Sequence, residues 1–246
     1  ARDFAVRELR DCGVMAELFM DRTRPTTLKQ RFRANEMTLL RVNHLHQASI
    51  SVKQQNLIYE QFDELVSDCE LLVFSDFNYG CLPQGLVDKI TTRAREGGLT
   101  IAADSQCSSQ IGDISRFRGM DLLTPTEHEA RVSLKNTEDG LVVLSEKLRT
   151  AAEAGNVILK LGSEGVLLHL RSEDGSLYTD RLSALNSLPR DVAGAGDSLL
   201  ICSAMAMAIG ATPWEAAYLG SVAAGVQVSR TGNIPLTQED LIREIS

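Results

Sequence analysis

The segment Asp191–Ser198 has a composition suited to chemistry. Within eight residues it combines two glycines and an alanine with an aspartate, Asp197, that follows them directly. A long apolar run comes next, and its length and many small residues predict a buried helix over 199–209. The glycines would then form a tight turn at the N-terminus of that helix. Free N–H groups and the helix dipole make such a turn a binding site for anions, and glycine lets the backbone approach a phosphate closely.

Asp197 is unusual at an anion-binding turn, because a carboxylate repels phosphate. Its position is explained if it removes a proton from a nucleophile that attacks the phosphate. A purely structural alternative stays open, since an acidic residue in the first turn of a helix is stabilised by the helix dipole. A short glycine motif by itself does not decide between these interpretations.

Length, charge and cysteine usage narrow the class of protein. The 246 residues suit one large α/β domain, or one domain with a small appendage, and the net charge of −8 argues against general nucleic-acid binding. No apolar run reaches the length that spans a membrane. The 5 cysteines are scattered without a C-x-x-C pair, which is typical of reduced thiols in a cytoplasm and argues against a structural zinc.

From residue 52 onward, helices and strands are expected to alternate, and short apolar runs predict strands buried in a parallel sheet. The expected strands are Leu71–Phe74, Leu99–Ala103, Asp121–Thr124, Val157–Leu161 and Val166–Leu170, with a hairpin turn at Asp174–Gly175. The expected helices are Ala1–Asp11, Val52–Ser67, Pro83–Glu96, Glu138–Ala154, one that starts at Pro213, and Thr237–Ile245. The loop 75–80 follows the first buried strand, at the end where α/β folds place ligands.

Residues 14–43 predict a small antiparallel sheet, or lid, inserted between helices. Its expected strands are Val14–Met20, Thr26–Ala34 and Met37–Val42, with a turn at Asn35–Glu36. Cations are concentrated in this part of an acidic protein, namely Arg22, Arg24, Lys29, Arg31, Arg33 and Arg41. They form either a solvated strand face or a patch that holds an anionic substrate, and both interpretations stay open.

The octet Asp191-Val-Ala-Gly-Ala-Gly-Asp-Ser198 resembles the D-T-x-G-A-G-D signature of the ribokinase-like (PfkB) sugar kinases, with Val192 where Thr is common. The resemblance implies that Asp197 is the catalytic base. The implied anion hole for the transferred phosphoryl group is Gly194, Ala195 and Gly196, and further cofactor contacts implied at this turn are Asp191 and Ala193.

Two further segments resemble the same family. Pro125-Thr-Glu-His-Glu129 is similar to its P-N-x-x-E pattern, with Thr126 in place of Asn, and implies that Glu129 acts on Mg²⁺ through water. Without the resemblance, Glu129 is an ordinary carboxylate in the first turn of a helix. The segment 159–168 resembles the nucleotide-side L-G-x-x-G segment, and the cofactor contacts it implies are Lys160, Gly162, Ser163 and Gly165. Asp104-Ser-Gln106 departs from the D-P-K or D-P-N that such kinases often have.

The lid carries a resemblance of its own. Arg24–Phe32 reads R-P-T-T-L-K-Q-R-F, and Leu39–Val42 reads L-L-R-V, which is similar to the lid of bacterial heptose-7-phosphate kinases within the PfkB family. Asn43 stands where those proteins have Asp. The substrate-binding residues that this resemblance implies are Arg24, Lys29, Arg31 and Arg41.

Together these resemblances imply a three-layer α/β/α sandwich with a mainly parallel sheet and a small β lid. They imply one kinase domain over 1–246, in which the usual leading strand is missing and an N-terminal segment is expected to be absent. The implied reaction is ATP-dependent phosphorylation of a sugar hydroxyl, with heptose 7-phosphate as the first candidate substrate. Another sugar or nucleoside kinase and a non-catalytic nucleotide-binding relative are the alternatives.

The same resemblance implies cofactors and partners. ATP and Mg²⁺ are the expected cofactors, and a monovalent cation such as K⁺ is a further candidate. A sugar and ATP are the expected small-molecule ligands, in a cytoplasmic protein with no nucleic-acid or membrane partner. A homodimer formed through the lid is a candidate assembly.

Overall fold

A central sheet organises the fold in the computed structural model, which describes residues 2–34, 37–44, 46–106, 112–172, 174–186, 188–232 and 234–245. The sheet has 6 strands in the order β3-β4-β5-β6-β7-β8. These strands are β3 (Leu71–Asp76), β4 (Thr100–Ser105), β5 (Leu122–Leu123), β6 (Asn156–Lys160), β7 (Val166–Arg171) and β8 (Leu177–Leu182). Strands β3 to β6 are parallel, whereas β7 is antiparallel to both β6 and β8. The expected mainly parallel sheet is confirmed.

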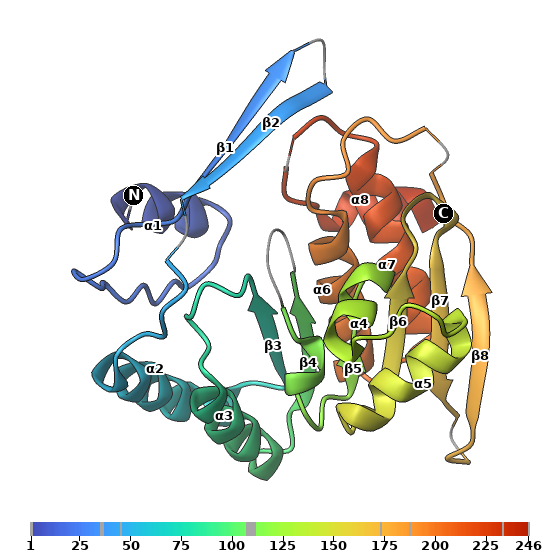
Figure 1. Ribbon diagram of the computed structural model, residues 1–246, viewed down its shortest axis with the longest axis horizontal. Coiled ribbons are helices and arrows are strands. Elements are labelled where there is room, and N and C mark those ends of the chain that lie inside the picture. The colour runs from blue at the N-terminus through green and yellow to red at the C-terminus, as the bar shows by residue number, and fades with distance from the viewer. Residues whose placement is uncertain are drawn as a thin grey trace.

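The central strands β4 to β7 are buried on both faces of the sheet, and successive side chains of each strand point to opposite sides. Ile101 and Ala103 belong to the core on one face of the sheet, while Ala102 belongs to the core on the other. Helices α3 (Gln84–Glu96) and α5 (Leu141–Ala151) pack into the first core, and α6 (Ala195–Ala208) and α7 (Pro213–Val228) pack into the second. The result is the expected sandwich of helices, sheet and helices (Figure 1).

The other helices extend these layers. They are α1 (Arg2–Asp11), α2 (Val52–Leu65), α4 (Glu127–Leu134) and α8 (Gln238–Ile245), with short 3-10 helices at Val66–Asp68, Ile114–Arg116 and Gly162–Glu164. The helix expected over 138–154 begins only at Leu141. The Asn136 side chain accepts hydrogen bonds from the N–H groups of Glu138 and Asp139, at 3.2 and 3.0 Å, which holds both residues in a turn instead.

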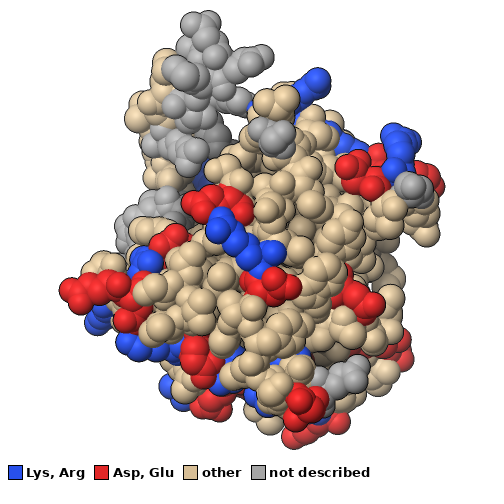
Figure 2. All heavy atoms as spheres, turned by 90° about the vertical axis from the view of Figure 1, so that its right-hand side faces the viewer, with Lys and Arg blue, Asp and Glu red and all other residues tan. Residues whose placement is uncertain are grey.

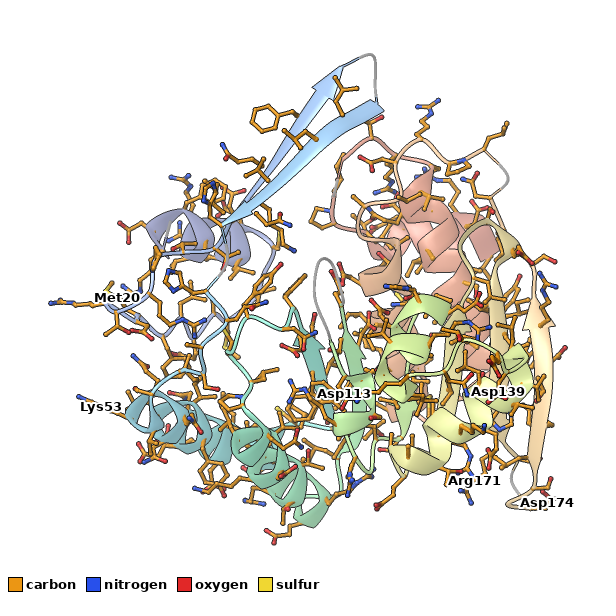
Figure 3. The ribbon with its side chains drawn as sticks, viewed as in Figure 1. Met20, Lys53, Asp113, Asp139, Arg171 and Asp174 are labelled. Carbon is orange, nitrogen blue, oxygen red and sulfur yellow. The ribbon has the colours of Figure 1, made fainter. Side chains whose placement is uncertain are left out.

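The lid is a two-stranded hairpin of β1 (Leu28–Ala34) and β2 (Met37–His44) that projects from the body of the molecule (Figure 1). The strand expected over Val14–Met20 is wrong, because this segment has no regular structure and Met15 is 93% exposed. Strand-forming side chains give no strand unless the backbone groups find a partner strand. Figure 3 shows Met20 on this segment. The expected turn Asn35–Glu36 lies outside the described residues.

The first helix is confirmed, but α1 buries none of its residues and Phe4 is 60% exposed. Its predicted apolar stripe is only partly covered, since Val6 and Leu9 are half-buried. On the face shown in Figure 2, acidic and basic side chains are interspersed rather than gathered by sign. Over the described ranges, every helix is too short or too polar to cross a membrane.

Candidate active site

The glycine turn and its helix are confirmed. Gly194 is the N-cap of α6 and has a left-handed backbone with φ of 80°, which glycine adopts without strain. Asp197 lies in the first turn of the helix. No side chain caps the start of this helix, so its first N–H groups are available to a ligand, except that Ala195 N–H donates to Val192 O at 3.4 Å. The turn therefore has the geometry of an anion site.

Gln106 holds the carboxylate of Asp197. Its Nε2 donates to Asp197 Oδ1 at 3.1 Å, and its own backbone N–H donates to Asp76 O at 2.8 Å. Gln106 follows β4 directly, so the carboxyl end of the parallel sheet fixes the orientation of the candidate base. The polar contact joins residues that are 91 positions apart in the sequence.

Lys160, at the end of β6, forms a buried ion pair beside the turn. Its Nζ lies 2.7 Å from Asp104 Oδ2, and the side chains are 13% and 2% exposed. Burial raises the pKa of Asp104 to about 6 against the effect of Lys160, and the carboxylates of Glu129 and Asp197 raise it further. A Cβ placed at Gly196 would lie 3.2 Å from Lys160 Nζ. The absent side chain at Gly196 thus lets a positive charge lie against the first turn of α6.

Glu129 closes the start of α4. Its Oε2 accepts the backbone N–H of Thr126 at 2.7 Å, and the Thr126 hydroxyl accepts the N–H of Glu129 at 3.2 Å, which is a reciprocal capping box. The hydroxyl of Thr126 therefore serves as the N-cap of α4. Glu129 is buried and caps a helix, as the structural interpretation expected, and it lies close enough to Asp104 to act on its pKa.

The expected turn between β6 and β7 is also confirmed. Leu161 N–H donates to Gly165 O at 2.8 Å, and Gly162 and Ser163 are exposed on the short helix between them. A Cβ at Gly165 would lie 2.0 Å from Leu182 O, so a backbone contact explains this glycine without a ligand. The exposed pair Gly162 and Ser163 is the part of this turn that a nucleotide could reach.

The carboxylate of Asp191 accepts two backbone hydrogen bonds that stabilise the turn. Its Oδ1 accepts the N–H of Ala193 at 3.1 Å and its Oδ2 accepts the N–H of Gly232 at 3.3 Å. Asp191 and Ala193 are the two residues of this turn that the resemblance expected to contact the cofactor. In the structure, the Asp191 carboxylate ties the turn to the loop that follows α7.

The hairpin reaches the sheet through the loop 75–80. Lys29 Nζ lies 4.7 Å from the ring centroid of Phe77 and 5.1 Å from that of Tyr79, within the range of cation–π contacts. Arg24 donates to His46 O at 2.9 Å and to Tyr79 O, so its guanidinium joins two segments of backbone. Arg31 and Arg41 are cross-strand partners in the hairpin. The side chains of both lie outside the described residues.

A polar cluster at this loop was missed in the sequence. Arg116 pairs with the buried Asp76 at 2.7 Å, and Asn78 Nδ2 donates to Ser105 Oγ and to Gln106 O, each at 3.0 Å. The sequence feature that could have indicated this cluster is the position of the loop directly after a buried strand, where α/β folds place ligands. Contacts thus run from Lys29 through this loop and Gln106 to Asp197.

The comparison with protein families decides the assignment. Residues 1–240 match the family described as pfkB family carbohydrate kinase. The chain belongs to this family.

Relatives of the pfkB family match over different shares of their length. Bifunctional protein HldE from Pelobacter propionicus is 27% identical over 236 residues, which cover 93% of this chain and 46% of that protein. Ribokinase from Giardia lamblia has a TM-score of 0.76 at 17% identity, over 98% of this chain and 78% of that one. Phosphofructokinase-2 from Escherichia coli in complex with potassium has a TM-score of 0.65 at 17% identity, over 83% and 65%. The chain spans about half the length of the curated relatives it matches.

The pfkB assignment raises the question of a metal. Within the ranges the structure describes, no group of three or more His, Cys, Asp or Glu side chains could hold a metal ion on its own. The carboxylates of Glu129 and Asp197 nevertheless both lie within electrostatic reach of the buried Asp104, which pairs with Lys160. This group of carboxylates fits a hydrated Mg²⁺ whose main ligands are phosphate oxygens and water.

Proposed function

We propose that this protein transfers the terminal phosphoryl group of ATP to a hydroxyl group of a sugar, with Asp197 as the general base. The observation that carries the proposal is the position of Asp197, which follows the left-handed Gly194 in the first turn of α6 and is held by Gln106. A fixed carboxylate beside free N–H donors suits phosphoryl transfer to a hydroxyl. Family membership and fold support the same reaction.

In the proposed reaction, the sugar oxygen bonds to the γ-phosphorus while the bond to the bridging oxygen of ADP breaks. Gln106 holds Asp197 Oδ1, and we assign Oδ2 to the substrate hydroxyl, whose proton it accepts. The N–H groups and dipole of the first turn of α6 stabilise the charge on the transferred group. The ammonium of Lys160 adds a positive charge at the same turn.

Mg²⁺ would neutralise charge on the triphosphate when it is bound. Glu129 is the residue we assign to a water molecule of that ion, and its capping bond to Thr126 N–H keeps the carboxylate in place. Gly162 and Ser163 are exposed at the neighbouring turn, and we assign them to the nucleotide.

We infer a phosphorylated sugar as the substrate, with heptose 7-phosphate as the first candidate. Lys29 lies over the aromatic rings of the loop 75–80, which contacts Asp197 through Gln106. The hairpin register sets Arg31 opposite Arg41, and like charges at opposite positions of a ladder favour an anion between them. Arginine and lysine bind phosphate oxygens well, and an acidic protein needs such local positive charge to hold a phosphate ester.

The test is a transfer assay with ATP against heptose 7-phosphate, the unphosphorylated heptose, fructose 6-phosphate and ribose, with the product identified by mass. We expect heptose 7-phosphate to be preferred. Asp197→Asn should lower turnover by about 10²–10⁴-fold and leave ATP affinity nearly unchanged. Glu127→Gln, which alters a first-turn carboxylate of α4, is the matched control and should keep turnover. Wild-type-like turnover in Asp197→Asn would overturn the base assignment, and ATP binding without transfer would indicate a non-catalytic relative.

We also infer a homodimer through the hairpin. Phe32 and Leu40 are cross-strand partners, and both are apolar although 50% and 55% exposed. An exposed apolar pair on one face of a hairpin is typical of an interaction surface. Analytical ultracentrifugation over a range of concentrations should show a dimer, and Phe32→Glu should shift it to monomer. A monomeric wild type would contradict the inference.

A further inference from the structure

The side chain of Gln227, near the end of α7, is a buried polar group with a specific set of partners. The residue is 1% exposed. Its Nε2 donates to Ala193 O at 3.3 Å and to Gly232 O at 3.4 Å. Both partners are carbonyl oxygens, so only the nitrogen end of the amide can face them.

These two carbonyls belong to the same residues whose N–H groups donate to Asp191. The end of α7 adds a third connection, because Val228 O accepts the N–H groups of Arg190 and Asp191 at 2.8 and 3.3 Å. The segment 190–193 is therefore held between the end of α7 and the loop that contains Gly232. Gly194 and the first turn of α6 follow directly, so this arrangement positions the candidate anion hole.

A monovalent cation at this place would need oxygen ligands. K⁺ is held in proteins by carbonyl and carboxylate oxygens that replace its water shell. The oxygens beside the turn include the Asp191 carboxylate and the carbonyls of Ala193, Val228 and Gly232, and each of them already accepts a hydrogen bond from an N–H group of the protein. The residues present do not fit the K⁺ that the family resemblance implied.

We propose that the amide of Gln227 takes the place of a monovalent cation and makes the anion-binding turn independent of one. The two N–H donors of the amide bring partial positive charge to carbonyls that would otherwise face one another. Gln227 is thus a positioning residue, which acts on the phosphoryl group through the turn. The inference rests on the proposed kinase function for its kinetic effect, but its structural part can be measured separately.

The test compares wild type, Gln227→Ala and Gln227→Glu in K⁺, in NH₄⁺ and in tetramethylammonium at one ionic strength. Wild type should show the same kcat in all three salts. In tetramethylammonium, kcat of each variant should fall roughly tenfold, the effect of losing two net hydrogen bonds, with little change in the KM for the sugar. K⁺ or NH₄⁺ should restore it, because either ion can bind the exposed carbonyls. Gln227→Glu keeps the side-chain volume of glutamine, so it can be measured even if Gln227→Ala does not fold.

The readout besides activity is the melting temperature. K⁺ should raise it in the Gln227 variants and leave it unchanged in wild type and in Ser221→Ala, a control for a buried polar group on the same helix. A wild type that needs K⁺ for activity or is stabilised by it, or variants that do not respond to K⁺, would overturn the proposal. If no sugar is phosphorylated under any condition, the proposed function fails, and the melting temperatures still decide the role of Gln227.

Discussion

Lys160 is the residue whose contacts bear most directly on how the candidate site would bind a nucleotide. Its ammonium pairs with the buried Asp104 and lies against Gly196, so one side chain connects the end of β6 to the first turn of α6. An ammonium has three donors, and a phosphate can use those that Asp104 does not. We therefore expect Lys160 to contribute to ATP affinity as a point charge.

Lys160→Met should weaken ATP binding, and the single variant should also unfold more easily because it leaves Asp104 buried without its partner. The double variant Lys160→Met/Asp104→Asn removes both charges and should recover much of that stability. In the double variant, the Kd for ATP should still rise by about tenfold or more, since a charge-assisted contact contributes roughly 1.5–3 kcal/mol. Calorimetric titration with ATP checks this, and an unchanged Kd would contradict a role of Lys160 at the phosphates.

At the scale of elements, α4 and α6 differ in whether side chains satisfy the N–H groups at the start of the helix. The first N–H groups of α4 are satisfied by Thr126 and Glu129, whereas α6 starts at a glycine with no side-chain cap. Only the uncapped start leaves donors for a ligand. The sequence already distinguished the two, because Thr126 and Glu129 have the spacing of a capping box and Gly194 and Gly196 do not.

Gly194→Ala tests the start of α6. A residue with a side chain at this left-handed position should lose roughly 1–2 kcal/mol in the free energy of unfolding. The control is Gly85→Ala in α3, where a Cβ would meet nothing within 4 Å and φ is not left-handed, so stability should stay or rise slightly. Urea titrations of both variants measure these changes in the free energy of unfolding. Equal stability of the two would show that the turn relaxes without strain.

The contact between α5 and β7 should give a pH-dependent contribution to stability. Hydrogen bonds from Arg149 and His169 lower the pKa of Glu146 to about 2 from its ordinary 4.5. Folding therefore favours the ionised carboxylate, and this contribution is present above pH 4.5 and is lost as the pH falls towards 2. Glu146→Gln should cost about 1 kcal/mol at pH 7, a small value because the side chain is 41% exposed.

Chemical denaturation at pH 7 and pH 3 should show that the difference between wild type and Glu146→Gln narrows at the lower pH. Glu164→Gln, which removes an exposed ion pair with Arg181, is the control and should have almost no effect at either pH. A difference that is constant with pH would mean that packing, and not charge, accounts for the effect of Glu146.

The whole molecule combines a sheet covered on both faces with a hairpin that projects from it (Figure 1). Figure 3 shows Lys53 on α2 and Arg171 at the end of β7, both away from the hairpin. We expect the cations of the hairpin to act on the substrate without acting on the fold.

The hairpin cations should determine preference for a phosphorylated sugar. Arg31→Ala or Lys29→Ala should raise the KM for heptose 7-phosphate by about tens of fold, because each lost charge-assisted contact costs roughly 1.5–3 kcal/mol. The KM for ATP should hardly change. Arg171→Ala, at an exposed position far from the hairpin, should leave both constants as they are. Equal effects on phosphorylated and unphosphorylated sugars, or none, would mean that the hairpin face is merely solvated.

Local patterns predicted most of the elements and the start of the candidate site. The runs 71–74 and 99–103 were apolar enough to predict buried strands, and the spacing of Gly194, Gly196 and Asp197 predicted the turn. The strand expected over Val14–Met20 failed because composition does not reveal whether a partner strand exists.

Long-range contacts were beyond the sequence. The Gln106–Asp197 bond spans 91 positions and the Lys160–Asp104 pair spans 56, and no local pattern marks either. Gln227 was equally hidden, since a polar residue in a helix of small residues gives no sign of which carbonyls it will face. The Gln106 and Lys160 contacts are defined only when the carboxyl ends of the strands meet the start of α6, and those of Gln227 only when the end of α7 packs against the loops at 193 and 232.

The contacts from Lys29 through the loop 75–80 and Gln106 to Asp197 bear on how ATP would be protected from water. Water is the most abundant competitor of any sugar, and it offers a hydroxyl but no phosphate group for the hairpin to hold. Because Gln106 already holds Asp197, discrimination against water would have to come from the hairpin, which can anchor a phosphorylated sugar but not a water molecule. Loss of ATP to hydrolysis would then be limited by the need for this second anchoring group.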